Sequence, residues 1–321
     1  MTRPTCPRLL ADVGGTNARF AWQAGPGAAI EDVRVLPCAQ HVSLQAAMQA
    51  YLADSTYERP RECAVAIANP VVGDRVQMTN HHWSFSINEL RQAMGFERLE
   101  VINDFTALAL ALPGLADADK RQVGGGHAWP DHAIALIGPG TGLGVSGLVP
   151  DGRGGWRPLQ GEGGHVSLSA HTPREQRVVH ALTQKYGHAS AERAVSGQGL
   201  VDLYIALCHA DDRLPTEGIT AAAISEAGLQ GTDLHAVEAL EMMCAFLGTV
   251  AGNLALTLGA KGGVFIGGGI VPRLGAWFDH SPFRARFEAK GRFHNYLADV
   301  PVWIITAQQS PALAGAAVAL G

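Results

Sequence analysis

The chain has 321 residues, of which 47% are apolar and 17% are charged, and its formal net charge is −5. This length suits two lobes better than one core, and the lack of any basic run in the sequence argues against nucleic acid as a partner. The five cysteines form no Cys-x-x-Cys pair, which argues against a disulfide framework or a structural zinc site. Such cysteines are typical of reduced thiols in a cytoplasmic protein.

Strands and helices are predicted to alternate along the chain, which indicates an α/β fold. Apolar runs predict strands at residues 9–11, 18–22, 63–68, 99–102, 133–149 (interrupted by a turn), 262–270 and 300–305. Helical spacing and capping signals predict helices at residues 43–53, 86–94, 107–112, 235–258 and 311–320, and helices that begin near Thr172 and Ser190.

One predicted helix has the length and composition of either a membrane span or a buried core helix. Residues 242–260 carry no charge and are long enough to span a bilayer. The segment is rich in Gly, Ala and Thr, contains Asn253 and lacks a basic flanking cluster, so we interpret it as a buried central helix. The first eight residues also lack the apolar stretch of a signal peptide. No membrane association is therefore expected.

Two segments share a pattern of strand, glycine-rich turn and strand, at residues 10–22 and 134–149. This similarity suggests an internal duplication. Between them the chain becomes polar and glycine-rich, and we place the boundary between two lobes near residue 114.

The first glycine-rich turn is Asp12-Val-Gly-Gly-Thr-Asn17. Its glycines would let the backbone approach a phosphate closely, and Thr16 and Asn17 add side-chain donors to a nest of N–H groups. Asp12 would be a poor neighbour of a phosphate unless a cation lay between them, which hints at Mg²⁺. A plain hairpin would also use Gly-Gly, and the turn alone does not decide between the two.

The second turn lies in Gly138-Pro-Gly-Thr-Gly-Leu-Gly-Val-Ser-Gly147, which contains a formal G-x-G-x-x-G. That dinucleotide fingerprint must open a helix, whereas residues 145–149 continue as a strand. We therefore reject a Rossmann site and expect a phosphate-binding hairpin in which Thr141 is a hydroxyl donor. No Gly-Lys-[Ser/Thr] occurs in the sequence, which excludes a P-loop.

Asn103-Asp104 follows a predicted strand, at the edge where α/β sheets place their ligands. A short carboxylate there is a candidate general base, and Asn103 beside it can hydrogen-bond a hydroxyl. An Asx turn that caps the next helix would explain the same pair equally well.

Three further segments carry candidate ligand-binding groups. Glu162 and His165 have E-x-x-H spacing, but the two glycines between them make a helix and a di-metal site improbable; the loop suits hydrogen bonding to a polyol, or is purely structural. Glu192 lies in the first turn of a predicted helix, where the helix dipole favours a carboxylate in any case. Residues 267–269, Gly-Gly-Gly, could accept a purine ring against bare backbone or form a tight turn.

Together these segments resemble the bacterial glucokinase family, within the hexokinase, heat-shock ATPase and actin superfamily, over essentially the whole chain. The matching segments are Ala-Asp-Val-Gly-Gly-Thr-Asn-Ala-Arg, Met-Thr-Asn-His (78–81), Val-Ile-Asn-Asp-Phe-Thr-Ala, Gly-Thr-Gly-Leu-Gly-Val, Gly-Glu-Gly-Gly-His-Val, Ser-Ala-Glu-Arg, Gly-Gly-Val-Phe-Ile-Gly-Gly-Gly-Ile-Val-Pro-Arg and Lys-Gly-Arg-Phe. No cysteine lies between His165 and Cys208, unlike the related branch with a cysteine-rich zinc motif. With about eight residues before the first strand, no DNA-binding head is expected.

The resemblance implies a two-lobe, actin-like ATPase (ribonuclease H-like) fold. A small α/β domain (residues 1–114 plus 307–321) and a large α/β domain (115–306) would flank a cleft for sugar and ATP. Asp104 would take the proton from the 6-hydroxyl of glucose, and four side chains would hold other hydroxyls: Asn103, Glu162, His165 and Glu192. The phosphates would be bound by Ala11, Asp12, Val13, Gly14, Gly15, Thr16, Gly140, Thr141 and Gly142, with Mg²⁺ on Asp12 directly or through water. The adenosine pocket would be lined by Gly267, Gly268 and Gly269.

The implied activity is transfer of the γ-phosphoryl group of ATP to glucose, the first step of glycolysis. A cytoplasmic homodimer that uses ATP and Mg²⁺, without structural zinc, is expected. Ala11 stands where relatives often carry Gly, with little effect expected. Two alternatives remain open: a kinase for another hexose, such as mannose or an N-acetylhexosamine, and a non-catalytic sugar-sensing regulator on the same fold.

Overall fold

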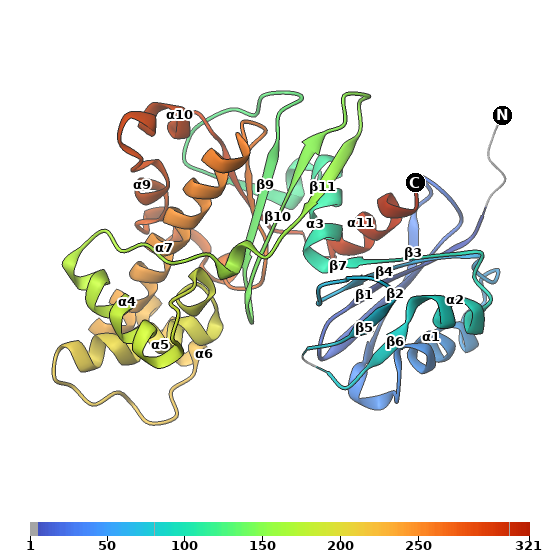
Figure 1. Cartoon of the computed structure of the whole chain (residues 1–321), viewed down its shortest axis with the longest axis horizontal. Helices are drawn as coiled ribbons and strands as arrows, with labels where there is room; N and C mark the ends of the chain where they lie inside the picture. The colour runs from blue at the N-terminus through green and yellow to red at the C-terminus, as the bar shows by residue number, and fades with distance from the viewer. Residues whose placement is uncertain (1–5, 80, 308) are drawn as a thin grey trace. The chain divides into compact units, whose positions relative to one another are not determined.

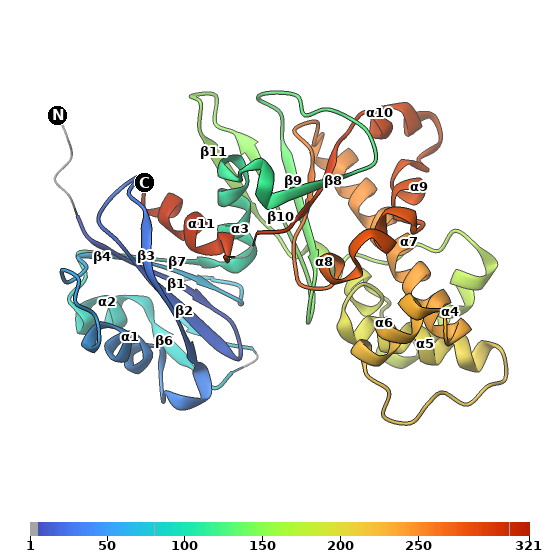
Figure 2. The ribbon, with the colours of Figure 1, turned by 180° about the vertical axis from the view of Figure 1, so that it is seen from behind.

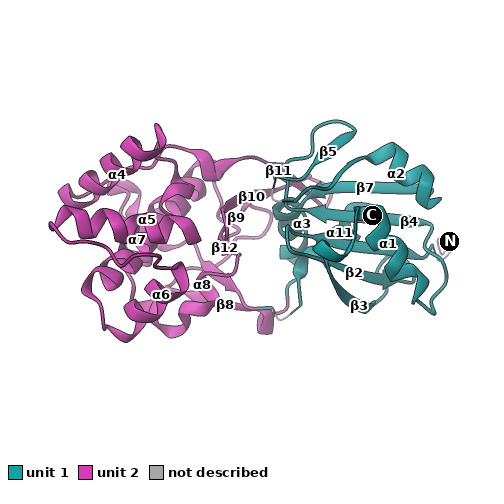
Figure 3. Cartoon of the chain, turned by 90° about the horizontal axis from the view of Figure 1, so that it is seen from below, with its two compact units in different colours: residues 1–115, 307–321 teal, residues 116–306 magenta. Residues whose placement is uncertain are grey.

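The computed structural model describes residues 6–79, 81–307 and 309–321 and has the expected α/β composition (Figure 1). Contacts divide the chain into two compact units, Met1–Leu115 with Ala307–Gly321 (unit 1) and Ala116–Thr306 (unit 2), each built around its own sheet (Figure 3). Asn80, in the segment 78–81 singled out above, lies outside the described residues.

The sheet of unit 1 has the strand order β3-β2-β1-β4-β7. Its strands are β1 (Arg8–Val13), β2 (Asn17–Gln23), β3 (Ile30–Pro37), β4 (Glu62–Ile67) and β7 (Arg98–Asn103). β1 pairs antiparallel with β2 and parallel with β4, and β4 pairs parallel with β7. A separate two-stranded hairpin consists of β5 (Arg75–Gln77) and β6 (Ser84–Ser86). Three parallel strands therefore end at one edge of the main sheet.

Helices cover both faces of this sheet (Figure 1). Leu9, Ala11 and Val13 pack with apolar side chains of α1 (Leu44–Ala53) and α2 (Ile87–Met94), while the intervening Leu10 packs with α11 (Pro311–Leu320) on the other face. This alternation is the two-residue period of a strand that is buried on both sides. As predicted, Ser43 and Ser86 cap α1 and α2 by accepting hydrogen bonds from the N–H groups of Ala46 and Glu89.

The last helix, α11, packs against α3 (Asp104–Ala111) at very short range (Figure 2). A Cβ atom added at Gly315 would collide with the carbonyl oxygen of Ala107. Small residues permit this approach of the two helix backbones, because no side chain separates them. The C-terminal segment thus supports the helix that begins with Asp104.

The sheet of unit 2 has the strand order β11-β10-β9-β12-β13-β8. Its strands are β8 (Lys120–Val123), β9 (Ile134–Pro139), β10 (Leu143–Pro150), β11 (Trp156–Gln160), β12 (Val264–Ile266) and β13 (Val302–Ile305). Five neighbouring strands, β11-β10-β9-β12-β13, repeat the spatial order of pairings in unit 1, with two antiparallel pairs followed by two parallel pairs. The structure therefore confirms the internal duplication, with β8 added at one edge.

The helices of unit 2 pack around a central apolar helix, α7 (Leu234–Leu258). The others are α4 (Pro173–Tyr186), α5 (Gly197–Ala210), α6 (Ala221–Gln230), α8 (Val271–Leu274), α9 (Phe283–Glu288) and α10 (His294–Ala298). Single 3-10 turns occur at Cys38–Gln40, Leu112–Gly114, Asp117–Asp119, Gly163–His165, Ala191–Arg193 and Gly291–Phe293, and a longer one at Gly275–His280. Among the described helices α7 alone is long and apolar enough to span a membrane, and 78% of its most apolar window is buried inside the protein. It is a core helix, as predicted.

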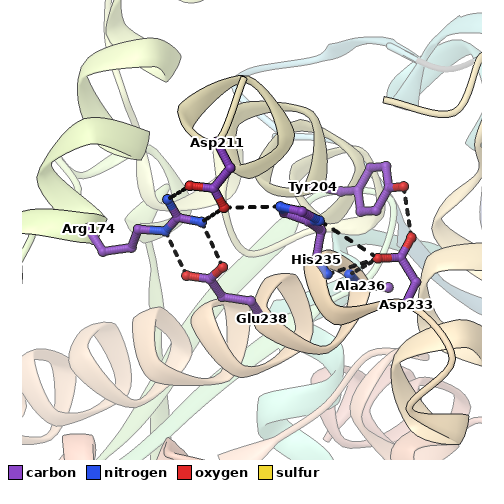
Figure 4. A network of polar contacts seen from close by, with 7 residues as sticks. All are labelled: Arg174, Tyr204, Asp211, Asp233, His235, Ala236 and Glu238. Atoms are coloured by element: carbon purple, nitrogen blue, oxygen red, sulfur yellow. Dashed lines mark hydrogen bonds and ion pairs between the residues drawn. The ribbon is translucent and has the colours of Figure 1, made fainter. Parts of the chain in front are cut away.

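A polar network ties three of these helices together (Figure 4). Arg174 on α4 donates hydrogen bonds to Asp211, which follows α5, and to Glu238 on α7. Hydrogen bonds from Arg174 hold the pKa of Asp211 below its usual range. Arg174 therefore shares its charge between two acidic groups, and His235 contacts the Asp211 carboxylate as well. The helical layer of unit 2 is therefore held by charge as well as by apolar packing.

Some boundaries differ from those predicted. The helix predicted from residue 107 begins at Asp104, because Asn103 caps it. The helix predicted from Ser190 is a single 3-10 turn, Ala191–Arg193, and α5 begins only at Gly197 with Ser196 as its cap. Glu192 therefore lies in an isolated turn, where the helix dipole offered for it above does not apply.

Candidate active site

The polar residues of unit 1 gather where its three parallel strands end. Val13, Ile67 and Asn103 are the last residues of β1, β4 and β7, and the strand register places them side by side. Asp12 and Asp104 border two of these positions. The carboxyl edge of a parallel sheet is where α/β proteins bind ligands. The structure thus brings together two candidate residues that are 92 positions apart in the sequence.

Asp104 is the first residue of α3 and is partly buried. Its Oδ1 atom accepts hydrogen bonds from the N–H of Phe105 (2.9 Å) and the amide of Asn103 (3.0 Å), whereas its Oδ2 atom accepts none from the described residues. Burial raises the pKa of Asp104 to about 6, and the negative charge of Asp12 also raises it. A carboxylate with this pKa and one free oxygen is well suited to accept a proton near neutral pH.

Asn103 serves as the helix cap that the alternative interpretation proposed. Its Oδ1 atom accepts hydrogen bonds from Phe105 (2.9 Å) and Thr106 (3.1 Å), and its amide donates to Asp104 and to the carbonyl oxygen of Asn69. The cap positions Asp104 and does not exclude contact with a ligand. The carbonyl oxygen of the amide is committed to the helix and its two N–H groups donate within the protein, so a sugar hydroxyl could be contacted only by exchanging the longer of these bonds, the one to Asn69 (3.4 Å).

Asn69 was not predicted as a site residue, and its backbone carbonyl oxygen accepts the hydrogen bond from the Asn103 amide. It is 8% exposed, and its Oδ1 atom accepts hydrogen bonds from the backbone N–H (3.0 Å) and hydroxyl (2.7 Å) of Thr79. Its amide donates to the carbonyl oxygen of Pro70 (2.9 Å). Asn69 therefore links the end of β4 to the β5–β6 hairpin segment. The Asn-Pro pair after a strand was the available signal, since it favours a turn.

Asp12 is held on one side by two donors. Its Oδ2 atom accepts hydrogen bonds from Arg19 (3.2 Å) and from the hydroxyl of Ser310 (2.8 Å), just before α11. Ser310 occupies the cap position of α11, but its side chain makes no capping bond. The Oδ1 atom accepts none from the described residues. No cluster of three or more acidic, His or Cys side chains that could hold a metal occurs among the residues described, and one carboxylate oxygen suits a Mg²⁺ that takes its other ligands from phosphates and water.

The turn after Asp12 is a tight hairpin in which Gly14 N–H donates to the carbonyl oxygen of Asn17 (2.9 Å). Gly14 does not have a positive φ, and an added Cβ would meet only ordinary contact at 3.6 Å. The fold therefore has room for an added Cβ atom at this position. A bare backbone is the feature that close approach of a phosphate would require.

The second turn, Gly140–Gly142, is tied to Glu192. The Oε2 atom of Glu192 accepts a hydrogen bond from Leu143 N–H (2.9 Å) at the start of β10. A Cβ added at Gly142 would lie 2.5 Å from that oxygen, whereas one added at Gly140 would meet nothing within 4 Å. Thus Gly142 accommodates Glu192, and Gly140 leaves its side of the turn uncovered.

Glu162 and His165 lie in one 3-10 turn, Gly163–His165 with Glu162 before it, and both are exposed. Their side chains have no hydrogen-bond partner among the described residues. Gly164 packs so closely on β10 that an added Cβ would collide with the carbonyl oxygen of Leu143. Backbone pairing of the segments 166–168 and 189–191 brings this turn beside that of Glu192. Three candidate sugar-binding residues therefore come together within unit 2.

The glycines after β12 pack on the same turn. Gly268 has φ +75°, and an added Cβ would collide with the carbonyl oxygen of Pro139. Gly197 at the start of α5 donates to the carbonyl oxygen of Gly140 (2.9 Å). A pocket of about 900 Å³ opens beside these segments, lined by Gly140, Thr141 and Gly269 and by residues of α5, α6 and α8. That volume is large enough for a nucleotide.

Comparisons with known proteins agree over the whole chain. A family model described as Glucokinase matches residues 9–321. The glucokinase of Chromobacterium violaceum is 54% identical over 98% of this chain and 89% of its own length. The crystal structure of a glucokinase from an Antarctic psychrotroph superposes with a TM-score of 0.88 at 38% identity, over 98% of both chains.

A ROK family glucokinase from Streptomyces griseus, solved in complex with glucose and AMPPNP, shares the fold with a TM-score of 0.64. It is 19% identical over 97% of this chain and 98% of that chain. The actin-like ATPase fold expected from the sequence is thereby confirmed. From its fold, its paired glycine turns and its match along residues 9–321, the chain belongs to the glucokinase family.

Proposed function

We propose that this protein is an ATP-dependent glucokinase, which transfers the γ-phosphoryl group of ATP to the 6-hydroxyl of glucose and releases ADP. The observation that carries the proposal is Asp104, a partly buried carboxylate beside Asp12 whose pKa is raised to about 6. Phosphoryl transfer requires a group that orients the nucleophile and accepts its proton. Membership of the glucokinase family over the full length supports the same reaction.

In the proposed mechanism the free Oδ2 atom of Asp104 accepts the proton of the glucose 6-hydroxyl. The hydroxyl oxygen bonds to the γ-phosphorus, and the bond from that phosphorus to the bridging oxygen of ADP breaks. Asn103 N–H and Phe105 N–H hold Oδ1, so Oδ2 keeps a defined direction. Positioning of this kind accounts for much of the rate acceleration in phosphoryl transfer.

The sugar is proposed to bind through Asn103, Glu162, His165 and Glu192. Exposed Glu162 and His165 have free polar atoms, while Glu192 keeps one carboxylate oxygen beyond the one held by Leu143 N–H. A carboxylate selects strongly among epimers, because a hydroxyl of the wrong configuration leaves it unpaired. These side chains would therefore set specificity for glucose, and Asp104 would supply the chemistry.

The nucleotide is proposed to bind through the two glycine turns. The first supplies Ala11, Asp12, Val13, Gly14, Gly15 and Thr16, and the second supplies Gly140, Thr141 and Gly142. Exposed backbone N–H groups and the Thr hydroxyls suit phosphate oxygens. Gly267, Gly268 and Gly269 would border the adenosine, and Gly269 lines the 900 Å³ pocket. The Oδ1 atom of Asp12 would hold Mg²⁺ directly or through water, and the ion when bound neutralises phosphate charge.

A single coupled assay tests the proposal. Purified protein should release ADP only when ATP, Mg²⁺ and glucose are all present. Mannose and N-acetylglucosamine in place of glucose test the other-hexose alternative, and glucose binding without any ADP release would instead indicate a sugar sensor. We also propose that the protein is cytoplasmic and forms a homodimer. Light scattering of the purified protein would test the homodimer.

A further inference from the structure

The wall of the 900 Å³ pocket in unit 2 has a polar side chain whose orientation is determined by a buried charge. Small and apolar residues make up most of the pocket lining, and its polar lining residues are Thr141, Gln198, Ser225, Glu226, Gln230 and Arg273. Gly140 and Thr141 lie at the end where the phosphates are proposed to bind. A base in this pocket would therefore meet apolar surface together with several hydrogen-bonding groups, of which Gln198 alone is anchored by a buried carboxylate among the described residues.

Gln198 is anchored by Asp202, one turn further along α5. Asp202 is 3% exposed and accepts hydrogen bonds from Lys185 Nζ (2.7 Å), the Tyr186 hydroxyl (2.5 Å) and the Gln198 amide nitrogen (3.0 Å). The hydrogen bond to Asp202 raises the pKa of Lys185, so that the ammonium group stays charged beside the carboxylate. In all three hydrogen bonds the Asp202 carboxylate is the acceptor, and the ammonium group of Lys185 can only donate.

This anchor determines which end of the Gln198 amide remains available. Since Asp202 accepts, the NH₂ end of the amide faces it, and the carbonyl oxygen Oε1 is the end left over. No described residue donates a hydrogen bond to Oε1. Gln198 thus offers the pocket an acceptor, and it cannot turn its amide to offer a donor without breaking a charge-assisted hydrogen bond.

We propose that Gln198 determines base specificity by accepting a hydrogen bond from the 6-amino group of adenine. Guanine and hypoxanthine carry an oxygen at that position, and two acceptors would face each other. Using the N1–H donor of those bases would require the ring to shift along the pocket. The inference rests on the proposed nucleotide site and adds a preference for 6-aminopurine nucleotides over 6-oxopurine nucleotides.

The test compares ATP with ITP, which differ at position 6 alone apart from the protonation of N1. We expect the wild-type protein to favour ATP by about tenfold in kcat/KM, the scale of one hydrogen bond lost together with an unpaired acceptor. Gln198→Leu should lower kcat/KM for ATP through KM, leave ITP nearly unchanged and bring the ratio close to one. An unchanged ratio in this variant would overturn the proposal.

A matched control is Gln230→Leu. Gln230 also lines the pocket, but its amide contacts Glu226, an exposed residue, at 3.3 Å. In this variant the ratio of kcat/KM for ATP to kcat/KM for ITP should stay at the wild-type value. A ratio that falls in Gln230→Leu and not in Gln198→Leu would show that Gln230, and not Gln198, discriminates between the two bases. Asp202→Asn, which frees the amide of Gln198 to turn, should also lower the ratio while Gln198 remains present.

Calorimetry with AMP and IMP separates this inference from the proposed function, because binding needs no turnover. Tighter binding of AMP, lost in Gln198→Leu, supports the inference. Equal binding of AMP and IMP by the wild-type protein overturns the inference and leaves the kinase assignment standing. If neither nucleotide binds, the nucleotide site itself is wrong, and the inference fails with it.

Discussion

The two sheets of this protein share one topology but carry different chemistry at corresponding turns. The turn between β1 and β2 in unit 1 follows Asp12, whose charge raises the pKa of Asp104 at the end of β7. The turn between β9 and β10 in unit 2 has no acidic residue of its own. Instead Glu192, which comes from a distant segment, accepts a hydrogen bond from Leu143, the first residue of β10. Duplicated scaffolds thus diverge in their loops, where function is added without altering the core.

This difference leads us to expect that unit 1 controls turnover, while unit 2 supplies most of the side chains that bind glucose and the pocket for the base. The glycines follow the same division. Gly142 and Gly268 are needed because an added Cβ would meet protein atoms, whereas Gly14 and Gly140 are not needed by the fold. Variants that separate turnover, binding and stability can therefore test the comparison.

The largest effect is expected from Asp104→Asn. Removing the proton acceptor while keeping the side-chain shape should lower kcat by at least ~10²-fold, with a small change in the KM for glucose. Steady-state kinetics would measure this. Asp54→Asn, at an exposed carboxylate of the same unit, is the matched control and should retain wild-type kcat. Near-normal turnover of Asp104→Asn would show that Asp104 is not the base.

Gly142→Ala and Gly140→Ala form a matched pair in unit 2. The added Cβ of Gly142→Ala would displace the Glu192 carboxylate, so we expect the KM for glucose to rise roughly 10- to 100-fold. Gly140→Ala meets no protein atom and should raise the KM for ATP instead. Titrations of both substrates with both variants would decide. Identical effects on glucose and ATP would remove the distinction between the two glycines.

The pH dependence of turnover tests the environment of Asp104 in the native protein. Because its pKa is raised to about 6 and the carboxylate is the active form, kcat/KM for glucose should be constant above that pH. Below it, the value should fall about tenfold per pH unit. An acid limb near pH 4, the ordinary range of an aspartate, would contradict the effect of burial and of Asp12.

The smallest expected effect concerns stability. Gly315→Ala would push α11 away from α3, and overpacking of this kind costs about 1–3 kcal/mol in the free energy of unfolding. Urea unfolding followed by circular dichroism would measure it. Gly114→Ala in the same unit has no atom within 4 Å of the added Cβ and should unfold like the wild-type protein. Equal midpoints for the two variants would mean that the contact between α11 and α3 can relax freely.

Local sequence was sufficient for much of the fold. The paired strand–turn–strand segments, the caps at Ser43, Ser86 and Thr172, and helix α11 are all where residue patterns predict them. These features depend on neighbours a few residues away, so a short window contains their cause. Elements without a strong local signal, such as β3 and α6, were not predicted, and the helix predicted at Glu192 was wrong because its turn depends on pairing with residues 166–168.

The sequence by itself determined the residue types that phosphoryl transfer needs and the family to which the chain belongs. Only the tertiary structure decided the hydrogen-bond partners of those residues and the pKa of Asp104. Ser310 reaches Asp12 across 298 positions, Glu192 reaches Leu143 across 49, and Asp12 acts on the pKa of Asp104 through the order of the strands. Burial and charge depend on distance in space, and strand order and helix packing set that distance, which no local pattern of residues records.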